Sequence, residues 1–335
     1  MSAAIAQLMP ERRGRTAADL YGMTFPPIKW VVEDYIAEGL TVLAGKPKLG
    51  KSWLLMAVAI AVANGGYVLG DRRCIQGAVL CAALEDTERR LRNRLEKLCG
   101  GFKPSAWPAD LTFWSYGEME RLGTGGLDQV RAWIRDHPDA RLVIIDTLAK
   151  VRSGPQGKET AYEADYREVG SLKALADETG VAIVVVTHTR KMGADDPFDT
   201  VSGTLGITGA ADATMILTRD GQGVTLHATG RDVAEIETAL EWEKDACRWR
   251  VLGDAQEVRR SDERTLILDA LRAETEPVGP REIADATGHS YAAVRALLVA
   301  MGKSGEVRKV GRGKYLHPDT PFTTLTSSQR EGKAA

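Results

Sequence analysis

One short segment, rich in glycine and lysine and set between two apolar runs, restricts the possible folds most. The letters GKPKLGKS, residues 45–52, follow the run LTVLA and precede the run WLLMAVAIAVA. The spacing matches G-x-x-x-x-G-K-S/T, a loop whose backbone wraps around a phosphate group. Such a loop needs a strand before it and a helix after it, so that backbone N–H groups and the helix N-terminus face the anion. The segment therefore predicts a nucleotide-phosphate site in an α/β fold.

Two side chains of this loop are predicted to bind the nucleotide and its metal ion. We expect Lys51 to reach the β- and γ-phosphates and the Ser52 hydroxyl to hold Mg²⁺, so ATP and Mg²⁺ are the expected ligands. A chance match in a glycine-rich turn is the alternative, and the strand and helix patterns on either side argue against it. The residues predicted to contact the nucleotide are Gly45, Lys46, Pro47, Lys48, Leu49, Gly50, Lys51, Ser52 and Trp53.

Apolar runs alternate with helical patterns along the first three quarters of the chain. Runs that are apolar throughout predict strands covered on both faces, and helices between them indicate a parallel sheet. The 44% hydrophobic content of the 335 residues is enough for one large core and a second small one. Strands are predicted at 40–45, 78–84, 141–147, 181–188 and 213–219, helices at 86–98 and 165–180, and two antiparallel strands at 223–231 and 239–252.

Polar residues follow three of the predicted strands. Because ligands bind where parallel strands end, Asp146 is a candidate metal ligand, and Glu85 is a candidate base that deprotonates the attacking water. His188 is a candidate sensor of the γ-phosphate. The alternative for Asp146 is a solvent-exposed strand end, and the alternative for His188 is a structural role. The alternative for Glu85 is a helix N-cap, although Asp86 or Thr87 suits that role better.

The order of these motifs, with the later segments VSGTLGITGAADATMIL and HATGRD, resembles RecA-fold ATPases of the plasmid RepA type, relatives of DnaB-like hexameric replicative helicases. The resemblance covers roughly residues 25–252. It implies that Glu85 is the hydrolytic base, that His188 couples the γ-phosphate to DNA-contacting loops, and that Arg231 inserts into the site of the neighbouring subunit. The family's lysine two residues before that arginine is Thr229 here, so Arg231 acts alone or Arg219 assists it. A surface salt bridge from Arg231 to Asp232 or Glu235 is the alternative.

The resemblance also implies two loops, residues 149–166 and 189–206, that hold single-stranded DNA in a central channel. Tyr162 can stack on a base, whereas Asp195, Asp196 and Asp199 oppose phosphate binding. Mobile surface loops without DNA contacts are the alternative. The basic candidates are Lys150, Arg152, Lys158, Arg190 and Lys191.

The C-terminal part carries three short helical patterns followed by a hairpin pattern, which predicts a small winged helix-turn-helix domain at 262–317. Its basic wing favours duplex or forked DNA through Arg308, Lys309, Arg312 and Lys314, and docking of a protein partner is the alternative. The remaining boundaries predicted are a flexible arm at 1–24, a RecA-like P-loop NTPase core at 25–252, a linker at 253–261 and a disordered tail at 318–335.

Charge and cysteine content restrict the kind of DNA contact and the cellular compartment that we expect. The formal net charge of −2 excludes a uniformly basic nucleic-acid coat, so DNA contacts must be local. The four cysteines have no metal-site spacing, and the longest apolar run is too short to span a bilayer, which favours a cytoplasmic protein. We expect a homo-oligomeric, hexameric ring that hydrolyses ATP and translocates on single-stranded DNA as a helicase of a plasmid, phage or integrated element. A DNA-bound ATPase switch without unwinding activity is the alternative.

Overall fold

A nine-stranded sheet forms the body of the protein in a computed structural model that describes residues 14–100, 107–190, 196–201 and 205–321. In chain order its strands are β3 (Gly39–Gly45), β6 (Ala78–Ala83), β7 (Leu111–Trp114), β8 (Ala140–Asp146), β9 (Ala182–Val186), β10 (Ala213–Asp220), β11 (Gly223–Gly230), β12 (Ile236–Glu243) and β13 (Arg248–Asp254). They lie side by side in the order β13-β12-β11-β10-β3-β9-β8-β6-β7.

The sheet is mixed but mostly parallel. Neighbours from β10 to β7 pair in parallel, and β11, β12 and β13 add an antiparallel extension. Every residue of β3, β6 and β9 is buried, as expected for strands that are apolar throughout and covered on both faces. The predicted α/β class with a mostly parallel sheet is confirmed. The edge strand β7 was not predicted, and its residues are only partly buried.

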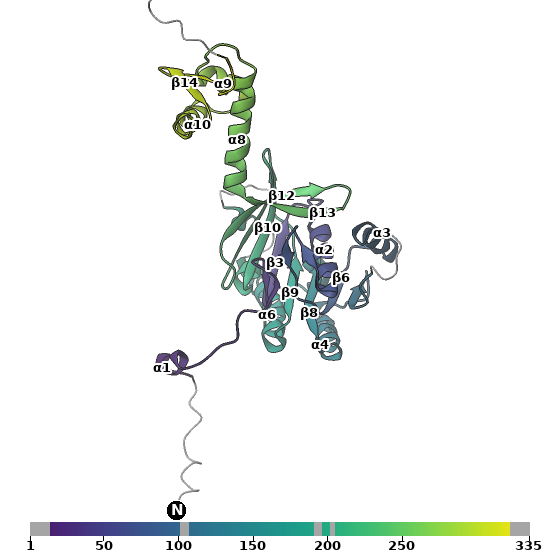
Figure 1. Ribbon diagram of the computed structural model, residues 1–335. Coiled ribbons are helices and arrows are strands. Elements are labelled where there is room, and N and C mark those ends of the chain that lie inside the picture. The colour runs from purple at the N-terminus through teal and green to yellow at the C-terminus, as the bar shows by residue number, and fades with distance from the viewer. Residues whose placement is uncertain (1–13, 101–106, 191–195, 202–204, 322–335) are drawn as a thin grey trace, which may run out of the picture.

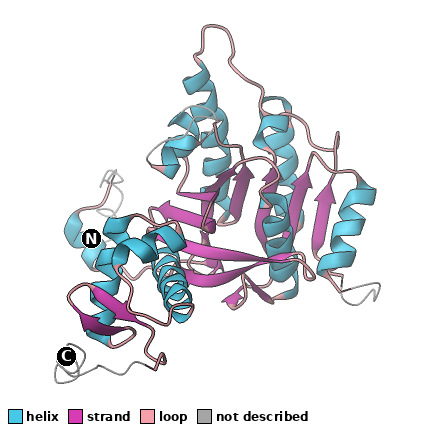
Figure 2. Ribbon diagram, turned by 90° about the horizontal axis from the view of Figure 1, so that it is seen from above, coloured by secondary structure: helices cyan, strands magenta, loops and turns pink. Residues whose placement is uncertain are grey.

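Helices cover both faces of this sheet (Figure 1, Figure 2). On one face α2 (Lys51–Asn64) and α3 (Glu88–Leu98) pack with alternate strand residues into one core. On the other face α4 (Gly126–Asp136), α5 (Leu148–Val151), α6 (Ala161–Thr179) and α7 (Leu205–Ala210) enclose a second core. Of the helices in the described residues, none has both the length and the hydropathy needed to cross a bilayer.

Small elements flank the body. Two short hairpins are β1 (Trp30–Val32) with β2 (Ile36–Ala37), and β4 (Tyr67–Val68) with β5 (Arg72–Arg73); the 3-10 helices η2 (Leu122–Thr124) and η3 (Pro197–Thr200) lie in loops. Within the predicted arm at 1–24, residues 1–13 lie outside the described residues. The rest includes α1 (Ala17–Tyr21), which has a capping box at Thr16, buries no residue and lies away from the body (Figure 1).

Most of the segment predicted as a linker, 253–261, is helical and belongs to α8 (Ala255–Arg272), which runs from the sheet to the C-terminal unit. The carboxylate of Asp254 caps the helix by accepting from the N–H groups of Gln256 (2.9 Å) and Glu257 (3.0 Å). Ala255 is fully buried against the sheet, and Arg259 donates to Asp220 at 3.1 Å. A polar, aperiodic segment thus becomes helical because it is capped and anchored at its start.

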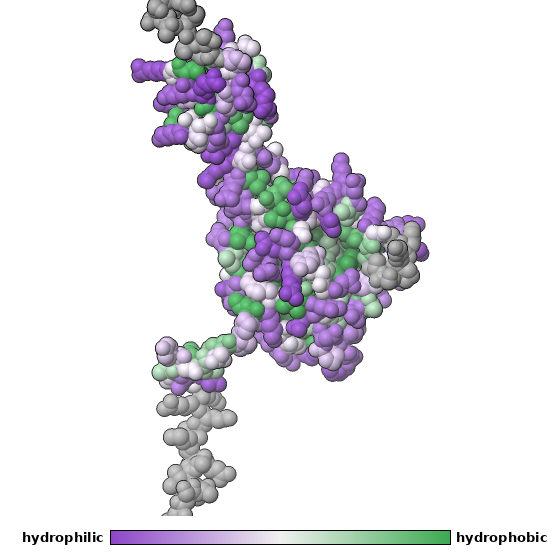
Figure 3. Space-filling view, viewed as in Figure 1, coloured by the Kyte–Doolittle hydropathy of each residue, from purple (hydrophilic) through white to green (hydrophobic). Residues whose placement is uncertain are grey.

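The outer end of α8 packs with α9 (Pro280–Thr287), α10 (Tyr291–Ser304) and the antiparallel pair β14 (Arg308–Gly311) and β15 (Lys314–Leu316). This C-terminal unit has a hydrophobic core of its own, which includes Ile267, Leu298 and Tyr315. Hydrophilic side chains cover most of its viewed face (Figure 3). The assignment of this unit as a winged helix stays a prediction, and of the predicted tail only 318–321 lies in the described residues.

Candidate functional site

The loop between β3 and α2 has the backbone that the motif predicts. Lys48 (φ 62°) and Gly50 (φ 98°) are in the left-handed region, and Gly50 is the N-cap of α2. The Lys51 ammonium is buried and donates to the carbonyls of Gly45 (2.7 Å) and Lys46 (3.1 Å). Burial lowers the pKa of Lys51, against the attraction of nearby carboxylates. The loop therefore presents a fixed cation at a helix N-terminus.

Asp146 ends β8 next to this loop. Its carboxylate is hydrogen-bonded to the Ser52 hydroxyl, and burial raises its pKa while that hydrogen bond opposes the rise. A hydroxyl and a carboxylate oxygen side by side are hard ligands of the kind that Mg²⁺ accepts in nucleotide sites. Ser52 and Asp146 therefore fit a metal-binding role, as the sequence predicts.

The two carboxylates after β6 have different surroundings. Asp86 is buried, and Arg90 donates to it at 3.1 Å while Arg94 donates to its second oxygen. The Glu85 side chain is exposed and lines the cleft beside the phosphate loop. Arg90 donates to the backbone carbonyl of Glu85, at 3.1 Å, and not to its carboxylate. Thr87 is the N-cap of α3, although its side chain accepts no capping hydrogen bond. Glu85 is thus the carboxylate whose side chain is available in the cleft.

His188 follows β9 and reaches the same place. The N–H of the preceding Thr187 donates to Leu43 of β3 at 2.9 Å, and the His188 Nδ1 lies 3.4 Å from the Lys51 Nζ. The ends of β3, β6, β8 and β9 therefore bring the predicted residues together around one cleft of about 530 Å³. Its lining includes Lys51, Ser52, Trp53, Glu85, Asp86, Arg90, Arg94, Asp146, Thr147 and His188.

Arg231 lies at the other end of the sheet. Gly230 pairs with Ala213, which pairs with Thr41 near the start of β3, whereas the phosphate loop follows the end of β3. The Arg231 guanidinium is 3.4 Å from the carboxylate of Asp212. The seven residues from Ala213 to Arg219 extend about 20 Å along a strand, so Arg219 and Arg231 cannot act at one site within one chain. Arg231 therefore lies away from the phosphate loop of its own chain.

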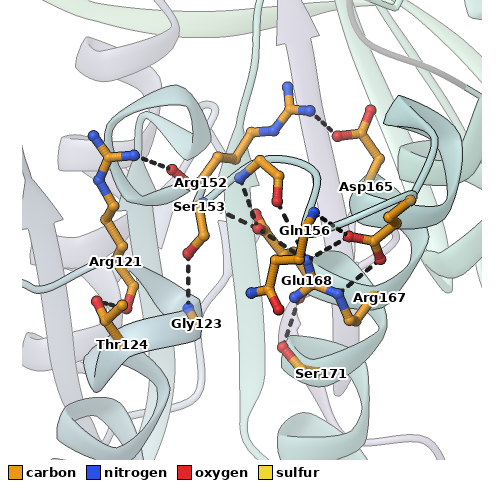
Figure 4. Close-up of polar contacts among 12 residues, drawn as sticks. Arg121, Gly123, Thr124, Arg152, Ser153, Gln156, Asp165, Arg167, Glu168 and Ser171 are labelled. Carbon is orange, nitrogen blue, oxygen red and sulfur yellow. Dashed lines mark hydrogen bonds and ion pairs between the residues drawn. The ribbon is translucent and has the colours of Figure 1, made fainter.

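The first predicted DNA loop is held against α6. Arg152 ion-pairs with Asp165, which is 1% exposed, and the backbone N–H groups of Ser153 and Gly154 each donate to Glu168 at 3.0 Å (Figure 4). The charge of Arg152 is therefore balanced within the chain. Lys150 and Lys158 are exposed.

An aromatic pair lies beside this loop. Tyr162 and Tyr166 are one helical turn apart, about half exposed, with stacked rings 6.2 Å apart. In the second predicted loop Arg190 is exposed, Lys191 and Asp195 lie outside the described residues, and the Asp196 carboxylate accepts from the Phe198 N–H.

The basic wing residues divide into two kinds. Arg308 donates to the carbonyls of Pro318 and Thr320, and Lys314 lies 3.2 Å from a carboxylate oxygen of Glu282. Lys309 in β14 and Arg312 at the turn of the hairpin are both exposed. The second pair is therefore the one available to a partner.

Sequence reasoning missed several residues around the cleft. Arg90 and Arg94 lie 4 and 8 residues after Asp86, on the same face of the predicted helix. This spacing could have predicted their contact with Asp86. Trp249 contacts the phosphate loop from β13, and no local pattern links the two. A larger cleft of about 680 Å³ lies beside β1, β12 and β13, with a lining that includes Trp30, Tyr35, Arg72, Glu235 and Glu237. Among the described residues of the predicted motifs it contains only Asp232, the last residue of HATGRD.

Comparisons with known proteins agree with this geometry. A family model described as an AAA domain matches residues 7–194, more than half of the chain. A solved structure whose title describes an ATPase domain is similar with a TM-score of 0.50 at 14% identity, over 64% of this chain and 85% of that one. At this identity the second likeness concerns the fold alone.

Proposed function

Because this chain belongs to the AAA domain family and carries its P-loop ATPase site, we propose that it is a ring-forming DNA motor. In this proposal it hydrolyses ATP between subunits and moves along single-stranded DNA as a helicase. The observation that carries the proposal is the place of Arg231, which is 65% exposed at the end of the sheet opposite the phosphate loop. An arginine that serves hydrolysis from there must serve a neighbour, and a closed ring gives every site such a neighbour.

Within one site the roles follow from the contacts. The loop N–H groups and Lys51 bind the phosphates, and Ser52 with Asp146 would hold Mg²⁺, which supplies charge neutralisation at the phosphates. Glu85 accepts the proton of the attacking water, because its side chain is open to the cleft while Asp86 is bound by two arginines. His188 next to Lys51 senses the phosphate state from the end of β9.

The proposed DNA contacts use the groups that the chain leaves accessible. Lys150 and Lys158 are exposed in the first loop, and the exposed faces of Tyr162 and Tyr166 can stack on bases. Lys309 and Arg312 of the C-terminal unit are proposed to bind duplex or forked DNA, with a protein partner as the competing outcome.

The deciding experiment measures ATP hydrolysis with and without single-stranded DNA, with K51A as the control for contaminating ATPases. Stimulation by DNA, together with closed rings in negative-stain images with a non-hydrolysable ATP analogue, supports a motor. A rate of hydrolysis that single-stranded DNA does not change, in a protein that forms no ring, contradicts the motor.

A DNA-bound ATPase switch without unwinding activity is the second candidate. The balance of Arg152 by Asp165 favours it, because that pair removes one cation from the proposed channel loop. Unwinding of a forked substrate by the wild-type protein, absent in K51A, distinguishes the motor from the switch.

A further inference from the structure

A tryptophan from the antiparallel end of the sheet contacts the phosphate loop. Trp249 of β13 is 3% exposed, and its indole N–H donates to the Gly50 carbonyl at 3.4 Å. A Cβ atom on Gly50 would lie 3.0 Å from the Trp249 ring, so the ring and the glycine are in close contact. The second glycine of the motif is therefore required by its left-handed φ and also by its neighbour.

The Gly50 carbonyl lies in the peptide plane that also contains the Lys51 N–H. Because a trans peptide is planar, its C=O and N–H point in opposite directions, and a donor that fixes the carbonyl also fixes the N–H. The same carbonyl accepts from the Leu54 N–H at 3.0 Å as the first hydrogen bond of α2. Trp249 thus adds a second donor to the peptide whose N–H faces the anion in a loop of this kind.

Aromatic packing holds Trp249 in place. Trp242 of β12 lies edge-on to it, with ring centroids 5.1 Å apart, and lies edge-on to Trp53 of α2 at 6.0 Å. Such edge-to-face pairs add to the stability that burial gives, so the orientation of the indole is well defined.

We propose that Trp249 is a positioning residue for the phosphate loop. Through its indole N–H it fixes the direction of the Gly50–Lys51 peptide, which makes the ribbon of β12 and β13 part of the ATP site. This ribbon lies outside the residues that the family model matches, 7–194. The inference rests on the proposed binding of ATP at this loop.

The test compares W249F with W242F. Both substitutions keep an aromatic ring in the cluster, but only W249F removes the donor to Gly50. We expect W249F to raise the Kd and the KM for ATP about 2- to 10-fold, as the loss of one neutral hydrogen bond does, with kcat changed less than about twofold. W242F keeps the Trp249 donor and an aromatic ring against it, so it should raise Kd and KM less than W249F does, although both variants lose thermal stability.

Equal Kd values for W249F and the wild type, or equal increases in both variants, would overturn the inference. Failure of the wild-type protein to bind ATP would instead refute the proposed function. Should W249F not fold, wild-type protein labelled with 5-fluorotryptophan provides the second test. Binding of an ATP analogue should then shift at least one ¹⁹F resonance besides that of Trp53, identified with W53F, and a shift of the Trp53 signal alone refutes the inference.

Discussion

The two adjacent carboxylates after β6 should separate catalysis from stability. Glu85→Gln removes a carboxylate that is exposed in the cleft, and Asp86→Asn removes one that two arginines hold. The side chains are neighbours in sequence and nearly the same size, so each variant is the control for the other. We expect the first to affect hydrolysis and the second to affect folding.

The magnitudes follow from the surroundings. Loss of a general base costs about 10²- to 10⁴-fold in rate, or about 3–5 kcal/mol in the activation barrier. Asp86 is 7% exposed and its partner Arg94 is 19% exposed, so neutralising Asp86 leaves a largely buried guanidinium without its counter-charge. Because Asn keeps an acceptor and Arg90 is mostly exposed, the cost should be about 1–3 kcal/mol, below that of a fully buried pair. At about 2–4 °C per kcal/mol for a domain of this size, Tm should fall by several degrees.

The assays are steady-state ATP hydrolysis, equilibrium binding of ATP and thermal unfolding for both variants. E85Q should bind ATP as tightly as the wild type, turn it over at least about 100-fold more slowly and unfold at the same temperature. D86N should unfold at a lower temperature and keep most of its hydrolysis at a temperature where it is folded. Normal turnover by E85Q combined with inactive but stable D86N would refute the reasoning and move the base to Asp86.

K51A should abolish tight ATP binding, measured by titration with a fluorescent analogue, because the loop loses its fixed cation; near-normal affinity would show that other groups hold the phosphates. R231A should lower hydrolysis by about 10³-fold, and mixing it with K51A should restore part of it by pairing an intact loop with an intact arginine across a hybrid interface; hydrolysis per subunit that is constant on dilution to monomers contradicts this. K309A/R312A should flatten the salt dependence of duplex binding by at most about 2 logarithmic units per decade of salt, whereas R308A/K314A should change it less; an unchanged slope in K309A/R312A points to a protein partner. Burial lowers the pKa of His227, against the attraction of Glu237, so the unfolded chain takes up this proton first and stability is lost as the pH falls from about 7.5 to 5.5. The H227Q variant should lose less stability over this range in urea titrations, and an identical loss in both proteins excludes His227 as the cause.

Local patterns predicted the candidate site at one edge of the sheet, because the relevant signals are short. The loop at 45–52 carries its own strand and helix context, and Glu85, Asp146 and His188 each follow directly on an apolar strand. Parallel strands end at the same edge of a sheet, and the neighbouring order β3-β9-β8-β6 brings their terminal residues together. The structure places these residues around one cleft, as expected.

Long-range contacts decided the rest. Trp249 lies 199 residues from Gly50 in the sequence, and only the pairing of β12 with β13 and β11 brings it to the loop. The balance of Arg152 by Asp165 depends on how the segment after β8 folds back onto α6. From the sequence alone, such an arginine is expected to be free to bind DNA, because the sequence does not show which residues lie next to it in the folded chain.

The sequence by itself determined the α/β class, the phosphate loop and the carboxylates beside it, since each depends on neighbours within a few residues. Only the tertiary structure decided that the polar segment after β13 is helical, through the Asp254 cap and the Arg259 anchor. Strand register likewise decided that Arg231 lies at the end of the sheet away from its own loop. The physical reason is that packing between segments distant in sequence fixes such contacts and strand registers. The free energy of that packing cannot be read from a local sequence pattern.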